Sequence, residues 1–418
     1  MRKPSARPNI IVLHTDQQRF DTIAAAGFPV MHTPNLDRLA ASGALLERFY
    51  VQAPVCMPSR ASMLSGRYPN AAGVTCNGPR MSEDVRCIQH MLSDAGYLTG
   101  MIGKLHFLPH SARDHREPHP RYGFDHLQVC DEPGCYRDAY REWVAEQDPP
   151  QLDAVNSGLP PARAQWEQMI GWQGTVQPPV ARDDFTPQVF RGDDHLTNAR
   201  FVADRSIQFL HERGSRPSFL FAGFYHPHSP LIPPQWALDR YDPQSIPLPP
   251  GDRRVRMPGS DRELSDTEVR EIDCITHAPC IIRYPGQVGA GSRIARMVEG
   301  VDLVPTLLEY AGVVRQPSLQ GRSMRPLLEG DEAAARDSVY CEFASPSRSN
   351  WAAVRTEQWF YARNAFGGEM LHDLQADPHE LRNIADEAKY SAALSEMRAL
   401  ALERSLHARP GVRLEARY

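Results

Sequence analysis

The chain has 418 residues, 41% of them hydrophobic, which is enough for one large α/β domain with a smaller second one. Its 46 basic and 51 acidic residues give a formal net charge of -5 without long runs of one sign, so the charge pattern indicates no nucleic-acid or membrane partner. No apolar run approaches the ~20 residues that cross a bilayer, and eight cysteines without an export signal predict reduced thiols in a cytoplasmic protein.

The first predicted strand is the β-branched run at residues 8–16, which ends on Asp16. Ligands of open α/β sheets gather at the carboxyl ends of parallel strands, so Asp16 is a candidate site residue. The alternative is that Asp16 caps a following helix. Residues 33–43 carry helix-start signals, spaced apolar residues and a final glycine, and they predict a surface helix.

Residues 49–55 read as an extended segment and residues 59–64 as a helix, so Cys56 falls in the turn between them. This position would place Cys56 beside a helix N-terminus. Backbone donors and the helix dipole favour anionic groups there.

Further strands are predicted at residues 97–102, 218–225 and 278–284, with helices at 196–210 and 302–310 between them. This alternation favours an α/β fold with a mostly parallel sheet flanked by helices. Aperiodic stretches at 149–187 and 227–258 predict long loops that form the walls of a pocket. From residue 337, short strands at 338–343, 351–355 and 359–363 and a final helix at 385–407 predict a small α+β unit. The predicted domains are residues 1–335 and 336–418.

The run CMPSRASMLSGR at residues 56–67 resembles the signature of the type I sulfatases, in which the cysteine is oxidised to formylglycine. Other segments resemble the same family in the same order: TDQQR at 15–19, GKLH at 103–106, PHSP at 227–230, IRYPG at 282–286, LQGRS at 319–323, LHDL at 371–374 and DPHE at 377–380. The resemblance covers nearly the whole chain. It implies an alkaline-phosphatase-like fold with a small C-terminal subdomain.

By this resemblance, Cys56 supplies the nucleophile for hydrolysis of a small sulfate ester, after conversion by a sulfatase-maturing enzyme. A hydrated aldehyde carries two hydroxyls on one carbon, of which one attacks sulfur and the other later expels sulfate. Unmodified cysteine lacks the second hydroxyl. Arg60 matches the arginine that holds the formylglycine and its metal environment.

The resemblance also implies a divalent cation, calcium in the family, bound by Asp16, Gln17 and residue 56. Many members carry a second aspartate where this chain has Gln17, so the site has one negative charge fewer. Lys104 and His228 match sulfate-binding positions. His106 would assist collapse of the diol, His228 would also protonate the leaving group, and Asn77 falls where some relatives contact substrate.

One family segment is missing from the sequence. Sulfatases carry a strand ending in Ser-Asp-His-Gly or Ser-Asp-Asn-Gly, and then a lysine, before the RYPG segment. Here the helix-like run at 264–272 continues directly into residues 273–280, so we expect one core strand and its metal-binding turn to be deleted near residue 273. The remaining ligands are fewer than the ~6–8 oxygens that calcium prefers. Asp194 and Asp273 are the substitutes that the sequence offers.

Three functions fit these observations: a metal-dependent sulfatase, a phosphonate monoester or phosphodiester hydrolase of the same superfamily, and a catalytically impaired sulfatase-like protein. Comparing turnover of sulfate and phosphonate esters separates the first two. A stoichiometric cation would exclude the third.

Overall fold

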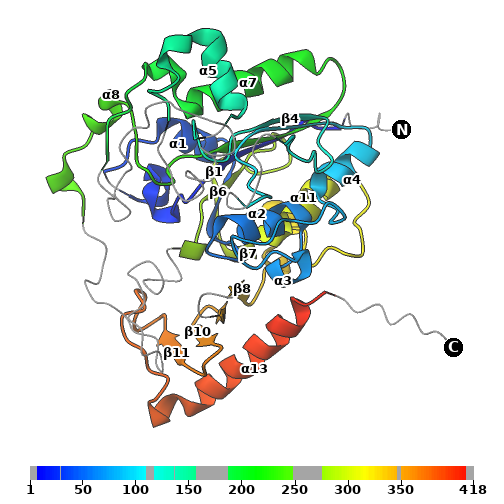
Figure 1. Ribbon diagram of the computed structural model, residues 1–418. Coiled ribbons are helices and arrows are strands. Elements are labelled where there is room, and N and C mark those ends of the chain that lie inside the picture. Colours follow the sequence, from blue (N-terminus) through cyan, green and yellow to red (C-terminus); the bar gives the residue numbers. More distant parts are fainter. Residues whose placement is uncertain are drawn as a thin grey trace. The chain divides into compact units, whose positions relative to one another are not determined.

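The computed structural model describes residues 7–28, 30–109, 117–135, 137–156, 187–247, 275–345 and 350–410 (Figure 1). The chain divides into two compact units, each made of segments that are distant in sequence. The first unit comprises Met1–Gln18, Ser82–Ile246 and Tyr310–Val313. The second comprises Arg19–Met81, Pro247–Glu309 and Val314–Tyr418.

A four-stranded parallel sheet forms the centre of the first unit, in the order β1 (Ile10–Thr15), β5 (Ser218–Phe224), β3 (Leu98–Gly103), β4 (His126–Val129). Strand β5 is buried along its length except at Phe224, as expected of a central strand covered on both faces. The described residues of this unit form the helices α4 (Ile88–Asp94), α5 (Ala139–Gln147), α7 (Asn198–Glu212) and α8 (Gln235–Leu238).

Helix α7 packs against β5 and β3, and α5 lies beside α7 (Figure 1). Phe201, Val202 and Phe209 of α7 join one buried cluster with Leu220 and Ala222 of β5. Their spacing of one, seven and eight residues gives α7 a single apolar face, and burying that face holds the helix on the sheet.

The second unit contains a three-stranded sheet in which β2 (Ala44–Tyr50) lies between β6 (Cys280–Ile282) and β7 (Ser292–Glu299). Strand β2 pairs in parallel with β7 and antiparallel with β6. The helices near it in sequence are α1 (Pro34–Ala41), α2 (Cys56–Ser65), α3 (Pro69–Ala72), α11 (Leu303–Tyr310) and α12 (Arg325–Leu328).

A four-stranded antiparallel sheet completes the second unit, in the order β11 (Glu369–Asp373), β10 (Trp359–Asn364), β9 (Trp351–Arg355), β8 (Val339–Phe343). Helix α13 (Ser391–His407) packs on this sheet through Leu394 and Met397 (Figure 1). Short 3-10 helices are found at Phe20–Thr22, Ala24–Ala26, Pro149–Gln151, Asp194–Leu196, Pro243–Ser245, Gly300–Asp302, Glu332–Ala334 and Ala388–Tyr390.

The predicted fold class is confirmed: parallel sheet strands are flanked by helices, and an antiparallel subdomain follows. The bounds predicted around Cys56 are wrong. Strand β2 already ends at Tyr50, and α2 begins at Cys56 itself instead of following it after a turn. The final helix starts at Ser391 rather than at residue 385. Strand β11 was not predicted.

Three predictions about the fold stay untested. The junction near residue 273, where a core strand is expected to be deleted, lies outside the described residues, as does most of the loop at 149–187. The boundary between residues 335 and 336 also stays a prediction; the first strand of the C-terminal sheet begins at Val339.

None of the described helices has the length and apolar character needed to span a membrane. The cysteines that the structure describes are free thiols, in agreement with the prediction of reduced cysteines: Cys56, Cys76, Cys87, Cys130, Cys135, Cys280 and Cys341.

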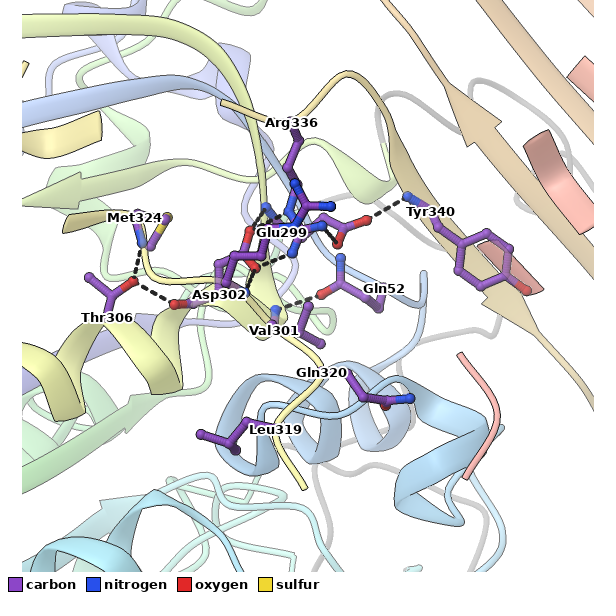
Figure 2. A network of polar contacts seen from close by, with 12 residues as sticks. Gln52, Glu299, Val301, Asp302, Thr306, Leu319, Gln320, Met324, Arg336 and Tyr340 are labelled. Atoms are coloured by element: carbon purple, nitrogen blue, oxygen red, sulfur yellow. Dashed lines mark hydrogen bonds and ion pairs between the residues drawn. The ribbon is translucent and has the colours of Figure 1, made fainter. Parts of the chain in front are cut away.

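A buried polar network holds the end of β7 to the start of the C-terminal sheet (Figure 2). The Glu299 carboxylate accepts a hydrogen bond of 2.7 Å from the backbone N–H of Tyr340. Arg336 donates from Nε to Asp302 over 2.7 Å, and its Nη1 lies 3.2 Å from Glu299. Gln52 accepts from the Val301 N–H at 2.9 Å. The second unit therefore depends on charged groups inside its core.

The buried imidazole of His372 on β11 predicts acid sensitivity. Desolvation by burial lowers the pKa of His372 to about 4, whereas the unfolded chain has the ordinary value near 6.5. The unfolded state therefore binds the proton first, and stability falls as the pH drops from about 6.5 to 4. We expect the urea midpoint at pH 7.5 to exceed that at pH 5, and His372→Phe to flatten this dependence. An unchanged slope in the variant would contradict this role for His372.

Candidate active site

Three strand ends of the first unit place a buried ion pair at one edge of its sheet. Asp16 follows β1, Tyr225 follows β5 and Lys104 follows β3, and these strands are neighbours in the order β1-β5-β3. Asp16 is 5% exposed and Lys104 is 1% exposed. The Lys104 ammonium forms an ion pair with the Asp16 carboxylate and lies 4.7 Å from the centroid of the Tyr225 ring. A charge pair is thus held at a site of low exposure, where the two charges interact more strongly than they would in water.

Close approach of β3 and β5 fixes the position of Lys104. The Lys104 N–H donates to the Gly223 carbonyl over 2.7 Å. A Cβ added at Gly223 would lie 2.2 Å from the Lys104 carbonyl oxygen, and one added at Gly103 would lie 2.1 Å from the Gly223 oxygen. Only glycine at these two positions lets the strands bring Lys104 to the sheet edge in this way.

Two non-glycine residues beside the pair adopt left-handed backbone conformations. Gln17 has φ 62° and His106 has φ 53°. Such residues are uncommon and concentrate where the surrounding structure imposes the conformation. At His106 the cause is visible, because the N–H groups of Leu105 and His106 donate to one Asp131 carboxylate oxygen at 2.9 and 2.8 Å.

His228 lies in a short turn after β5, against the ring of Tyr225. The two ring centroids are 4.9 Å apart, and the Tyr225 hydroxyl donates to the Ser229 carbonyl over 2.5 Å. His228 Nδ1 lies 2.6 Å from the same carbonyl, which can only accept, so the neutral imidazole carries its hydrogen on Nδ1. Nε2 is then the nitrogen that takes up or releases a proton.

In the second unit, Cys56 is the first residue of α2 and is partly exposed, while Arg60 on the next turn is 1% exposed. Residues at i and i+4 lie on the same face of a helix, so Cys56 and Arg60 share one face of α2. The Met57 N–H donates to Asn77 Oδ1 over 2.9 Å. Asn77 therefore satisfies one of the N–H groups that a helix leaves unpaired at its start.

The predicted site residues divide between the two units. Asp16, Gln17, Lys104, His106 and His228 belong to the first unit, and Cys56, Arg60 and Asn77 to the second. Sequence reasoning missed Tyr225 and Asp131. The only signal for them was their place after a strand, and the strand at β4 was not predicted.

The donors of the first unit fit a hard cation in kind, because Asp16 offers carboxylate oxygens and Gln17 an amide oxygen. They are few compared with the ~6–8 oxygens of a calcium site. Asp194, a proposed substitute, lies exposed at the start of a 3-10 helix, and Asp273 is outside the described residues.

A protein-family model described as Sulfatase matches residues 8–273. The chain belongs to the sulfatase family. A second model, described as the C-terminal part of N-sulphoglucosamine sulphohydrolase, matches residues 272–406 of this sulfatase. The family is one of sulfuric ester hydrolases, and it implies a formylglycine and a divalent cation.

An arylsulfatase of Clostridium perfringens is 25% identical to this sulfatase over 95% of the chain and 94% of its own length. Two solved structures share the fold. A phosphonate monoester hydrolase of Agrobacterium radiobacter is 22% identical, covers 96% of both chains and has a TM-score of 0.77. A structure in complex with its substrate D-glucosamine-2-N,6-O-disulfate is 19% identical, covers 96% of this chain and 98% of its own, and has a TM-score of 0.71.

Gly223→Ala should displace Lys104, because the added Cβ meets a backbone oxygen at 2.2 Å. A shift of about 1 Å in a positioning group costs on the order of 100-fold in rate, so we expect kcat/KM for a sulfate ester to fall by about 10- to 100-fold. Gly289→Ala is the control, since its Cβ would meet nothing closer than 3.6 Å. Equal activity in the two variants would show that Lys104 does not need this strand contact.

Proposed function

We propose that this chain hydrolyses a sulfate ester through a formylglycine nucleophile made from Cys56. The observation that supports this most is the position of Cys56 as the first residue of α2, with Arg60 buried one turn later. Backbone N–H groups at a helix start and the positive end of the helix dipole stabilise negative charge. A hydrated aldehyde at residue 56 would carry its developing charge at that point.

The charged groups of the first unit have the chemistry that sulfate binding and proton transfer require. In this proposal, Lys104 binds sulfate oxygens and stabilises the charge that develops as the ester bond breaks. His228, whose Nδ1 is held by the Ser229 carbonyl, presents Nε2 to bind sulfate or to protonate the departing alcohol. His106 takes the proton from the second hydroxyl, which allows the aldehyde to re-form and sulfate to leave.

Asp16, Gln17 and residue 56 would hold a divalent cation, calcium by family resemblance. When bound, this ion would lower the pKa of the attacking hydroxyl and neutralise sulfate oxygens. In the structure the Asp16 carboxylate forms an ion pair with the Lys104 ammonium, so the negative charge of Asp16 is balanced by Lys104. We expect activity to fall after chelation and to return with added calcium.

A sulfatase-maturing enzyme is the partner that this proposal requires, because the oxidation of Cys56 needs a catalyst and an oxidant outside the chain. The proposal places the reaction in the cytoplasm, as the sequence predicts. Asn77 contributes by holding the start of α2, and it would also face substrate.

The deciding experiment combines mass spectrometry with a two-substrate assay. The peptide containing residue 56 should be 18 Da lighter than the cysteine form, since conversion of –CH2SH to –CHO changes the side chain by that mass. The same preparation should turn over 4-nitrophenyl sulfate faster than a phosphonate monoester. Faster phosphonate turnover would replace the sulfatase proposal with the phosphonate one. Unmodified cysteine without bound metal and without turnover would favour an impaired sulfatase-like protein.

A further inference from the structure

A cavity of about 540 Å³ lies between the C-terminal sheet, α13 and the segment after α3, entirely within the second unit. Its volume is that of a small-molecule site. None of the residues predicted for catalysis lines it. Its walls come from β8, β9 and β10, from Asn70 and Thr75, and from α13 and Arg409.

Positive charge predominates in this cavity. Arg363, Arg398 and Arg409 line it, against the single carboxylate of Glu342. Arg398 is held by Glu369, with Nε 2.9 Å from Oε1. Arg363 and Arg409 are exposed, and they interact electrostatically with Glu369 and Glu342 respectively. The three arginines outnumber these two acids, which leaves positive charge for an anion.

Glu342 is held by hydrogen bonds from neutral donors, and Arg409 also interacts with it electrostatically. Its two carboxylate oxygens accept from the Asn70 N–H at 2.9 Å and from the Tyr340 hydroxyl at 3.0 Å. Burial raises the pKa of Glu342. The arginines therefore keep a net positive charge in the cavity.

The rest of the lining suits a sugar ring. Trp351 is half-buried and its indole lies 6.4 Å from the Phe343 ring, so a rigid aromatic surface forms one wall. Aromatic surfaces with a few convergent polar groups are typical of specific small-molecule sites. Asn350 also lines the cavity; its Oδ1 accepts from the Ser345 N–H at 2.8 Å, and its amide NH2 can donate to a hydroxyl group of a ligand. The Ser405 hydroxyl in the same wall is hydrogen-bonded to Tyr340.

The cavity is also linked to the start of α2. The Ala344 N–H donates to the Thr75 carbonyl over 3.3 Å, which joins the cavity wall to the segment that carries Asn77. Asn77 in turn accepts from Met57 at 2.9 Å. Two residues span at most about 7 Å, so Thr75 lies about one sugar unit from the residue that caps α2.

We propose that this cavity binds an acidic sugar unit of the substrate, adjacent to the unit that carries the scissile sulfate. The inference rests on the proposed sulfatase function and narrows its substrate class to sulfated oligosaccharides with a second anionic group. Arg363 and Arg409 bind the anion, and Trp351 packs on the ring. A carboxylate and a second sulfate offer the same chemistry to these arginines.

Calorimetric titration with sugars that need not react tests the cavity directly. The probes are unsulfated chondroitin disaccharide, which carries a carboxylate, glucosamine 6-sulfate, which carries a sulfate, and neutral chitobiose. The double variant Arg363→Gln/Arg409→Gln should bind the acidic probes at least tenfold more weakly than the parent, because hydrogen bonds to charged groups are lost. Arg296→Gln, an exposed arginine on β7 outside the cavity, is the matched control and should bind as the parent does.

Tighter binding of the disaccharide would identify the anion as a uronate. Tighter binding of glucosamine 6-sulfate would identify it as a second sulfate. Either result supports the proposal that the cavity binds an acidic sugar. The proposal would be overturned if the double variant bound the acidic probes as tightly as the parent does, or if chitobiose bound as tightly as the acidic probes. Hydrolysis of 4-nitrophenyl sulfate, which has no second sugar, should be the same in all variants. If no sulfate ester is hydrolysed at all, the titration still decides the cavity separately.

Discussion

Replacing Cys56 with alanine is expected to lower kcat for sulfate ester hydrolysis by at least about 10⁴-fold, the loss that removal of a catalytic nucleophile produces. Alanine keeps the first turn of α2 and its contact from Met57 to Asn77, because both use backbone N–H groups. It removes the thiol that the maturing enzyme needs in order to oxidise Cβ to the aldehyde. Initial rates with 4-nitrophenyl sulfate, on protein matured together with a sulfatase-maturing enzyme, measure the effect.

Cys280→Ala is the matched control, since Cys280 is also a partly exposed free thiol of the second unit but lies on strand β6. Its rate should remain within about twofold of the parent, as it has no part in the proposed chemistry. Thermal unfolding of the two variants should agree closely. Equal rates in Cys56→Ala and the parent would show that residue 56 is not the nucleophile.

Local sequence pattern predicts the place in the fold of those candidate site residues that stand at a strand end or a helix start. Asp16 and Lys104 follow β1 and β3, and Cys56 begins α2. Their pairing depends on strand order. β5 is far from both in sequence yet lies between them, and no local pattern encodes that order.

The parts that the sequence did not reveal depend on contacts between distant segments. Asp131 fixes the turn at His106 because β4 pairs with β3, and Asn77 caps α2 by accepting from Met57, which lies twenty positions earlier. The cavity of the C-terminal sheet is likewise made from strands and a helix that only packing brings together. Polar residues in such places look like ordinary surface residues in the sequence.

Strand β1 has two exposed apolar side chains. It lies at the edge of the four-stranded sheet that the described residues form, and Ile11 and Leu13 on one of its faces are 47% and 62% exposed. A β-branched strand of this kind is typically covered on both faces. The deletion predicted near residue 273 lies outside the described residues and stays a prediction.

Glu299→Ala is expected to destabilise the second unit by about 3–5 kcal/mol, the cost of leaving buried charges without their partner. Glu299 is fully buried, with its carboxylate between Arg336 and Arg404 and accepting from the Tyr68 hydroxyl at 2.5 Å. Burial alone would raise the pKa of Glu299, but the two arginines lower it below its usual value. The carboxylate is therefore charged in the native state, and its stabilising effect is lost as the pH falls below about 4.5, the ordinary value for glutamate.

Urea unfolding followed by tryptophan fluorescence at pH 7.5 measures this cost. Glu299→Gln keeps the size of the side chain and an acceptor for the Tyr340 N–H. The decrease in its free energy of unfolding relative to the parent therefore measures the contribution of the charge without that of packing. Glu357→Ala is the surface control: Glu357 pairs with Arg48 at 2.6 Å, but its side chain is 58% exposed, and exposed pairs contribute less than about 1 kcal/mol. If Glu299→Ala costs no more than Glu357→Ala, the buried network of Figure 2 does not stabilise the join between β7 and β8, and the apolar contacts of α13 with the C-terminal sheet must hold it instead.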